Sequence, residues 1–426
     1  MMEAQAHRRG NSNHSDDLVL QYVPWRLSSF PRPIVELALT VLLWQASTGV
    51  FLLSLVQQYL PQHLEASAAF PGYALAIYAA GRFLLQAPAG WLADRIGRRR
   101  TLTLGIAVSL PSVFLMLQVQ EPSSFLAFSA LYGAGSAAIW PAIMAYVGDT
   151  QQPSTRGRTL NLLNISQLVG LGAGTMAGVT LIDLISYQAA FAACLGFSAL
   201  ALFFAYRGAR RSPSPSAASV PQAHANKTAR FSSKLLSLRV LLLAGIALLL
   251  SIGTTVQAPV VSAYANDVLH TKLYVMGLML IGPGVAAAFL AIRFGHLADR
   301  FGRQLPLIGG LAIAALCYFA LSQTTHPLLA VYLIVLAGLA YAVSIPAWGA
   351  AALDATELGS RGLMLGMLAT VQGIGGALGQ AVGGLTNAAW GPVAPFKMGA
   401  VLLALALLLT LMHLQHQRRA ETVALA

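Results

Sequence analysis

Charged residues and glycines gather in one short run of an otherwise apolar chain. The run GWLADRIGRRR extends from Gly90 to Arg100, and a second run, GHLADRFGR, extends from Gly295 to Arg303. An aspartate among several arginines can form ion pairs, and a carboxylate also binds the N-terminus of a helix, where the backbone dipole is positive. Both runs therefore offer ion pairs and a possible contact with a helix N-terminus.

The composition indicates that these charges belong to a membrane protein. Of the 426 residues, 57% are hydrophobic and 9% are charged, whereas a soluble domain carries about 25% charged residues. A chain with so few charges cannot cover a water-facing surface, which predicts an all-α membrane protein of many helices. The net charge of +12 comes mostly from short segments between apolar runs, so it indicates membrane topology rather than binding to nucleic acid.

Metal, cofactor and enzyme chemistry find no support in the sequence. Cys194 and Cys317 lie inside apolar runs, and the nine histidines lack ligand spacing, so we expect no disulfide, metal or cofactor. No Ser/His/Asp arrangement, carboxylate pair or phosphate-binding Gly-Lys-Ser/Thr loop is recognisable. We therefore expect neither an enzyme nor a self-contained ATP-driven pump.

Crossing the hydrocarbon of a membrane takes about 20 apolar residues of helix. Twelve segments qualify: 37–60, 72–92, 101–119, 125–147, 160–182, 187–206, 238–264, 273–293, 304–322, 327–349, 363–386 and 393–413. They predict a tail (1–33), a six-helix bundle (34–206), a linker (207–236), a second six-helix bundle (237–414) and a tail (415–426). Lysine and arginine concentrate in the tails, the linker and alternate loops, which places these segments in the cytoplasm.

The two bundles are related by a constant spacing. Gly90 and Gly295 are 205 positions apart, as are Asp94 and Asp299. The same spacing joins further identical residues, among them Tyr59 and Tyr264, Gly133 and Gly338, Pro141 and Pro346, Asp149 and Asp354, and Gln167 and Gln372. Matches in register along both halves predict two parallel six-helix repeats, related by an axis along the membrane normal.

In these residues the chain resembles the major facilitator superfamily. The family signature Gly-x-Leu-Ala-Asp-Arg-x-Gly-Arg-Arg is matched in full from Gly90 to Arg99, and from Gly295 to Gln304 with only the last basic residue lost. The resemblance covers residues 34–414. It implies a monomeric transporter of the plasma (inner) membrane that moves a small molecule by alternating access.

The resemblance also implies a latch on the cytoplasmic side. Asp94 would meet the start of the eleventh helix near 361–363, and Arg98 would pair with Asp149; Asp299 would meet the fifth helix near 157–159, and Arg303 would pair with Asp354. The latch residues are Gly90, Asp94, Arg95, Gly97, Arg98, Asp149, Gly295, Asp299, Arg300, Gly302, Arg303 and Asp354. The alternative is that these charges only set topology and loop shape.

Two departures from drug exporters of the family weaken an antiporter interpretation. Ser129 stands where such exporters often carry an arginine, and the fifth span has no Gly-Pro pair. Glycines at a spacing of four mark that span and the eleventh instead: Gly170, Gly174 and Gly178, and Gly375, Gly379 and Gly383. Such stripes predict close helix packing rather than ligand contacts.

Arg82 is the clearest candidate for a ligand contact. It precedes Gly90 by eight residues, about 12 Å along a helix, which places it near the midplane, where a charge is costly. Its repeat counterpart is Ala287, so the shared scaffold does not require arginine. Arg82 could bind an anionic group of a substrate or lock a buried network. It could instead snorkel toward the membrane surface or form a structural hydrogen bond to helix carbonyls. No carboxylate lies deep in a span, so the coupling ion, a proton or another, stays open.

The spans that line the cavity in this family carry neutral and aromatic side chains. The candidate cavity residues are Arg82, Trp44, Gln45, Thr48, Tyr132, Trp140, Thr254, Gln257, Tyr341, Trp348, Gln167 and Gln372. Taken singly, each is better explained by interhelical packing or hydrogen bonding than by a ligand contact. As a set they favour an amphipathic solute, neutral or weakly anionic.

Three functions follow from these patterns. A secondary transporter of a small organic solute is favoured, with a slight preference for efflux. An importer or facilitator of the same fold is the alternative within transport. A non-transporting sensor or scaffold is the alternative outside it, and two intact signature runs disfavour it because a static scaffold needs no reversible lock.

Overall fold

Helices account for the secondary structure of the part of the chain that the computed structural model describes, residues 30–211, 238–294, 304–354 and 361–425. The first half contains α1 (Arg32–Val50), η2 (Phe51–Tyr59), α2 (Leu60–Gln62), α3 (Phe70–Leu84), α4 (Gln86–Ile96), α5 (Arg98–Met116), α6 (Pro122–Ser136), α7 (Ile139–Thr150), α8 (Pro153–Leu184) and α9 (Tyr187–Arg211). The second half contains α10 (Leu238–Thr255), η4 (Ala258–Val260), α11 (Val261–Ala263), η5 (Tyr264–Val268), α12 (Leu273–Phe294), α14 (Gln304–Leu321), α15 (Pro327–Asp354), α16 (Arg361–Trp390) and α17 (Ala394–Leu425).

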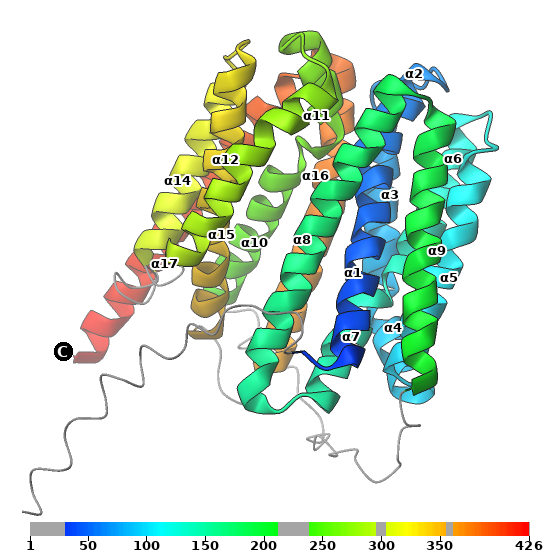
Figure 1. The fold of residues 1–426 in the computed structure, drawn as a ribbon. Coiled ribbons are helices and arrows are strands. Elements are labelled where there is room, and N and C mark those ends of the chain that lie inside the picture. The colour runs from blue at the N-terminus through cyan, green and yellow to red at the C-terminus, as the bar shows by residue number, and fades with distance from the viewer. Residues whose placement is uncertain (1–29, 212–237, 295–303, 355–360, 426) are drawn as a thin grey trace, which may run out of the picture.

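Each of the twelve predicted spans falls on this helical framework, and the halves form two bundles side by side (Figure 1). Within the described residues, seven helical stretches are both long and apolar enough to cross a membrane. The predicted second span is divided between α3 and α4 because Pro88 has no N–H to donate to Leu84. Pro141 likewise leaves Ala137 without a helical donor, and α6 and α7 separate there.

The ends of the predicted domains differ somewhat from the helix ends. Helix α9 continues to Arg211, into the predicted linker, and residues 212–237 lie outside the described part. Helix α17 continues to Leu425, through most of the predicted tail 415–426. The domain boundaries themselves stay predictions.

Each bundle packs around its own core. The core of the first bundle includes Phe51, Leu55, Ile106, Phe125 and Phe191, and that of the second includes Leu243, Ile246, Leu311, Leu403 and Ala406. The glycine stripe of α8 packs on α1, where the Gly174 Cα meets the Ala46 backbone with no room for a side chain. The stripe of α16 packs on α10 in the same way at Gly379 and Ile252. The predicted role of both stripes in close helix packing is seen in the structure.

Contacts between the bundles gather at one end. We call the end where α1 begins and α9 finishes the tail-side end, at the bottom of Figure 1, and the opposite end the far end. At the far end Gly72 of α3 lies against Gly384 of α16, and Asn387 Nδ2 donates to the Ala68 carbonyl at 3.3 Å. Beside them, Val179 of α8 is buried in a cluster of second-bundle residues.

Candidate functional site

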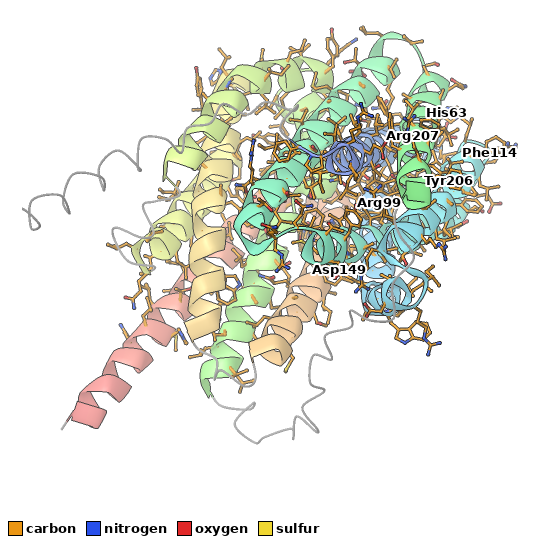
Figure 2. The ribbon with its side chains drawn as sticks, turned by 60° about the horizontal axis from the view of Figure 1, so that its bottom comes forward. His63, Arg99, Phe114, Asp149, Tyr206 and Arg207 are labelled. Carbon is orange, nitrogen blue, oxygen red and sulfur yellow. The ribbon has the colours of Figure 1, made fainter. Side chains whose placement is uncertain are left out.

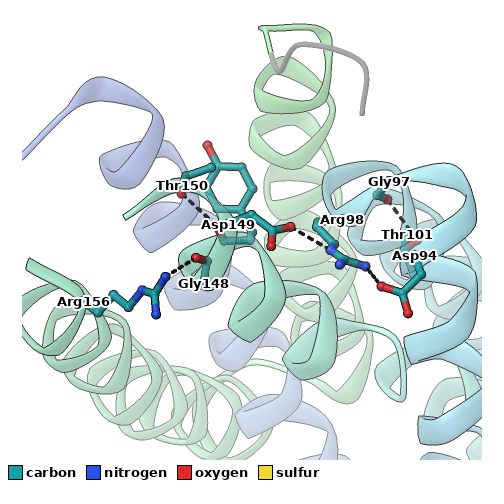
Figure 3. Close-up of polar contacts among 9 residues, drawn as sticks. Asp94, Gly97, Arg98, Thr101, Gly148, Asp149, Thr150 and Arg156 are labelled. Atoms are coloured by element: carbon teal, nitrogen blue, oxygen red, sulfur yellow. Dashed lines mark hydrogen bonds and ion pairs between the residues drawn. The ribbon is translucent and has the colours of Figure 1, made fainter. Parts of the chain in front are cut away.

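The first signature run forms a corner at the tail-side end. Helix α4 ends at Ile96 and α5 begins at Arg98, so Gly97 alone forms the turn, with a φ of 98°. Glycine adopts this left-handed conformation without the strain that a Cβ would cause. The corner places Asp94 and Arg98 four residues apart, with their side chains facing each other (Figure 3).

Arg98 joins two carboxylates from different helices. Its Nε lies 3.0 Å from Asp149 Oδ2, at the end of α7, and its NH1 donates to Asp94 Oδ1 (Figure 3). Partial burial lowers the pKa of the Arg98 guanidinium, but the hydrogen bonds and charges of the two carboxylates outweigh this and raise the pKa overall. The Asp94 and Asp149 side chains are 67% and 59% exposed. Each pair is therefore worth at most about 1 kcal/mol.

Among the described residues, Asp94 pairs with Arg98 of its own bundle, and no contact of Asp94 with the second bundle is found there. The part of the chain that is described has nothing within 4 Å of a Cβ placed at Gly90, and the same holds at Gly157 and Gly366. These glycines lie on the tail-side halves of α4, α8 and α16. Among the described residues, α4, α5 and α7 pack mainly on helices of the first bundle, whereas the far ends of the two bundles are packed together. The contact of Asp94 with the start of α16 stays a prediction for the opposite conformation.

The remaining latch residues divide into two groups. Arg95 lies over the exposed Trp91 ring, 4.1 Å from its centroid. The second signature run, with Gly295, Asp299, Arg300, Gly302 and Arg303, lies outside the described residues. Asp354 ends α15, and its side chain lies outside them too. The mirrored half of the latch therefore stays a prediction.

Arg99, next to Arg98, is a buried charge that the sequence analysis did not single out. It is 5% exposed, and its NH2 donates to the Pro33 carbonyl at 2.7 Å and to the Tyr146 hydroxyl at 3.0 Å. Its guanidinium also lies over the Tyr146 ring. Close by, Arg207 pairs with the buried Glu36 at 3.4 Å, and both arginines are visible at this end in Figure 2. Three consecutive arginines could not reveal which one turns inward.

Three of the cavity candidates belong to the core of the first bundle. Trp44 and Tyr132 are 3% and 0% exposed, and their rings stack with centroids 5.3 Å apart. The Tyr132 hydroxyl lies within hydrogen-bonding distance of Ser47 and Thr48, which are also buried. Their hydrogen-bonding and packing needs are thus met inside the bundle. In this conformation they form a structural cluster, with no surface open to a solute.

The other neutral candidates are distributed along both bundles. Gln257 donates to the Tyr318 hydroxyl and to the Thr254 carbonyl, both at 2.6 Å. Trp348 is buried, while Tyr341 is 42% exposed. Gln45, Trp140, Gln167 and Gln372 are partly buried. Tyr341 is the aromatic candidate that this conformation leaves most accessible.

Arg82 occupies a different environment. It lies in the last turn of α3, on the helix face between Tyr78, which is buried in the first bundle, and Phe83, whose ring meets Gly373 of α16. Arg82 itself is exposed, and its neighbour Phe83 makes the contact with the second bundle. Among the described residues, no hydrogen bond or ion pair occupies its guanidinium. The geometry presents an unpaired cation where the two bundles face each other.

Two repeated bundles of membrane-spanning helices, packed together at the far end, are the architecture of multi-pass membrane transporters. The model of the Major Facilitator Superfamily matches residues 37–254 and 243–424. The chain belongs to this superfamily, whose members transport solutes and are not enzymes. The first signature run and the repeat had predicted this family, and the prediction is confirmed.

Known relatives are distant but cover most of the chain. The proton-coupled antiporter flippase LtaA of Staphylococcus saprophyticus is 24% identical over 360 residues, 82% of this chain and 86% of LtaA. The class C tetracycline resistance protein of Escherichia coli is 26% identical over 304 residues, 68% of this chain and 74% of that protein.

Solved structures of low sequence identity share the fold. The nucleoside transporter NupG superposes with a TM-score of 0.68 at 12% identity, covering 90% of this chain and 99% of NupG. An inward-facing, occupied bacterial homologue of the human lysosomal transporter Spinster gives 0.70 at 15% identity, covering 89% of this chain and 96% of the homologue. The predicted fold class, two six-helix bundles, is thereby confirmed.

Proposed function

We propose that this secondary transporter exports a small amphipathic organic solute that carries an anionic group, in exchange for an ion. The observation that carries the proposal is Arg82, an exposed and unpaired cation at mid-depth, next to the contact of Phe83 with the second bundle. A charge in such a place is costly, so a compensating anion from the solute is a natural partner. The exposed ring of Tyr341 offers an apolar surface for the rest of the molecule.

The direction and the coupling ion are proposed from the relatives and from the charge pattern. The relatives are named as a proton-coupled antiporter flippase and a tetracycline resistance protein. These names favour efflux of the solute, driven by protons that enter down their gradient. The lysines and arginines of the sequence favour a cytoplasmic tail-side end. This conformation would then be inward-facing, ready to accept a solute from the cytoplasm. In this proposal the protein acts as a monomer in the plasma membrane, with both termini cytoplasmic.

An importer or facilitator would use the same fold, and the likeness to a nucleoside transporter is compatible with either direction. A static sensor or scaffold is disfavoured because the chain carries the signature run in both halves, and a static scaffold needs no reversible lock.

Transport by purified protein in proteoliposomes tests the proposal. A panel of amphipathic anions and their neutral and cationic analogues is loaded with and without a pH gradient. We expect counterflow of the anions, accelerated by a gradient that drives protons the opposite way. Movement of cations alone, or movement of no solute under any gradient, would refute it.

Two variants separate binding from folding. Arg82→Ala should raise KM for anionic solutes by about tenfold or more while neutral analogues move normally, and Arg82→Lys should restore part of the affinity. The matched control is Arg100→Ala, which removes an exposed arginine from the tail-side end of α5. Equal effects of Arg82→Ala on anions and neutral analogues would show a structural role instead.

A further inference from the structure

The seventh span is interrupted where the two bundles meet. Helix α10 ends at Thr255, and the chain passes through the short turn η4 before α11 begins. Pro259 causes the break because it has no N–H to donate to the Thr255 carbonyl. In a continuous α-helix the Ser262 N–H would donate to the Ala258 carbonyl, four residues earlier. The turn between them leaves this donor and this acceptor to find other partners.

Both groups bond to one side chain of the other bundle. The Ser262 N–H donates to Gln57 Oε1 at 2.9 Å, and Gln57 Nε2 donates to the Ala258 carbonyl at 2.8 Å. A primary amide carries the same donor and acceptor as a peptide group, so it can bridge the gap in the helix. Gln57 is 4% exposed and Ser262 2%, so water has little access to this contact.

Gln57 and Ser262 are also repeat counterparts, 205 positions apart. A contact between a position and its own counterpart lies on the axis that relates the two bundles. The first bundle approaches this point in η2, a stretch of π-helix, and such irregular turns are frequent at functional sites. The contact thus lies where the bundles must part if the far end opens.

We propose that the Gln57 amide is the positioning residue that closes the far-end gate, by standing in for the missing backbone bond between Ala258 and Ser262. Opening the gate withdraws the amide, and the two backbone groups then bond to each other or to water. The neighbouring contacts, Asn387 with Ala68 and Gly72 with Gly384, close with it but supply no such replacement. The inference rests on the proposed alternating access.

Removal of the amide penalises only the closed gate. Gln57→Leu keeps the size of the side chain but leaves a buried donor and a buried acceptor without partners, which is expensive. We expect the ratio of far-end-open to far-end-closed protein to rise by about tenfold or more. Gln58→Leu is the matched control, since Gln58 is 1% exposed, and its amide oxygen has no hydrogen-bond partner among the described residues.

Gln57→Glu makes the state of the gate depend on pH, which a purely structural role of this side chain would not do. An ionised carboxylate accepts from the Ser262 N–H but cannot donate to the Ala258 carbonyl, whereas a protonated carboxyl does both. We expect this variant to resemble the wild type at low pH and Gln57→Leu at high pH. The comparison is made within one folded sample, so it holds even if Gln57→Leu fails to fold.

The experiment measures distances between spin labels in nanodiscs, without solute. Labels on Ser67→Cys and Asp267→Cys, both exposed at the far end of different bundles, report on the gate, while the native Cys194 and Cys317 are buried. A longer distance in Gln57→Leu, its absence in Gln58→Leu and a pH-reversible distance in Gln57→Glu support the proposal. An unchanged distance in folded Gln57→Leu, or no pH dependence in Gln57→Glu, overturns it. Transport is assayed separately, so a wild type that moves no solute would refute the function and leave the gate result standing.

Discussion

Replacing Gly72 by alanine tests whether the far ends of the bundles separate during the working cycle. A Cβ on Gly72 would lie 2.6 Å from both the Gly384 Cα and the Gln380 carbonyl oxygen of α16. Ordinary contacts of carbon begin at about 3.5 Å, so α3 and α16 must move apart by about 1 Å at this point. Overpacking of this kind typically costs about 1–3 kcal/mol.

Opening of the bundles at the far end relieves this clash. We therefore expect the substitution to raise the ratio of open to closed protein and to leave the free energy of unfolding nearly unchanged. A difference of about 1–3 kcal/mol corresponds to a change of about 5- to 150-fold in the ratio of open to closed protein. The thermal stability of the variant should stay close to that of the wild type.

Single-molecule FRET in nanodiscs, with dyes on Ser67→Cys and Asp267→Cys, measures that ratio. Gly81→Ala is the matched control on the same helix, because its Cβ would lie 2.8 Å from the Ala130 carbonyl inside the first bundle. It should lower the apparent Tm without changing the FRET distribution. If Gly72→Ala leaves the distribution unchanged, or Gly81→Ala changes it equally, the reasoning fails.

Three further expectations follow from the same structure. Asp149→Asn removes one ion pair of a carboxylate that is 59% exposed, so thermal unfolding should show a loss of stability below about 1 kcal/mol; a larger loss would mean that the pair is structural. Arg99→Lys loses planar contacts in a buried site and should lower the apparent Tm by several degrees, whereas the exposed Arg100→Lys should not; equal effects would contradict the assignment. Pro259→Ala permits a continuous seventh helix and should reduce the effect of Gln57→Leu on the gate in a double-mutant cycle; purely additive effects would argue against the exchange of bonds.

Much of the fold could be predicted because the membrane permits few solutions. In hydrocarbon every backbone group must bond within its own helix, so twelve apolar runs of sufficient length imply twelve helical spans. The constant spacing of 205 then relates the two halves without any structure. The glycine stripes also carry a local meaning, since only glycine allows the approach seen at Gly174.

The candidate site was predictable only in part. The run around Arg98 combined charges that can pair at short range, and the structure brings Arg98 and Asp149 together. Periodicity does not say which helix face meets a neighbour, so it could not separate cavity contacts from packing at Trp44 and Tyr132, which are buried in this structure. Gln57 was missed because one amide in an apolar span resembles many others, although its polar counterpart Ser262 was a signal.

The sequence by itself determined the environment, the helical spans, the repeat and the family, because these depend on composition and on spacing along the chain. Only the tertiary structure decided which end of the bundles is closed, that Arg82 stays unpaired while Arg99 is buried, and that Gln57 completes the backbone of the opposite bundle. Those outcomes depend on how helices distant in sequence face each other. The open and closed arrangements of the bundles use the same helices, and no local sequence pattern indicates which of the two is formed.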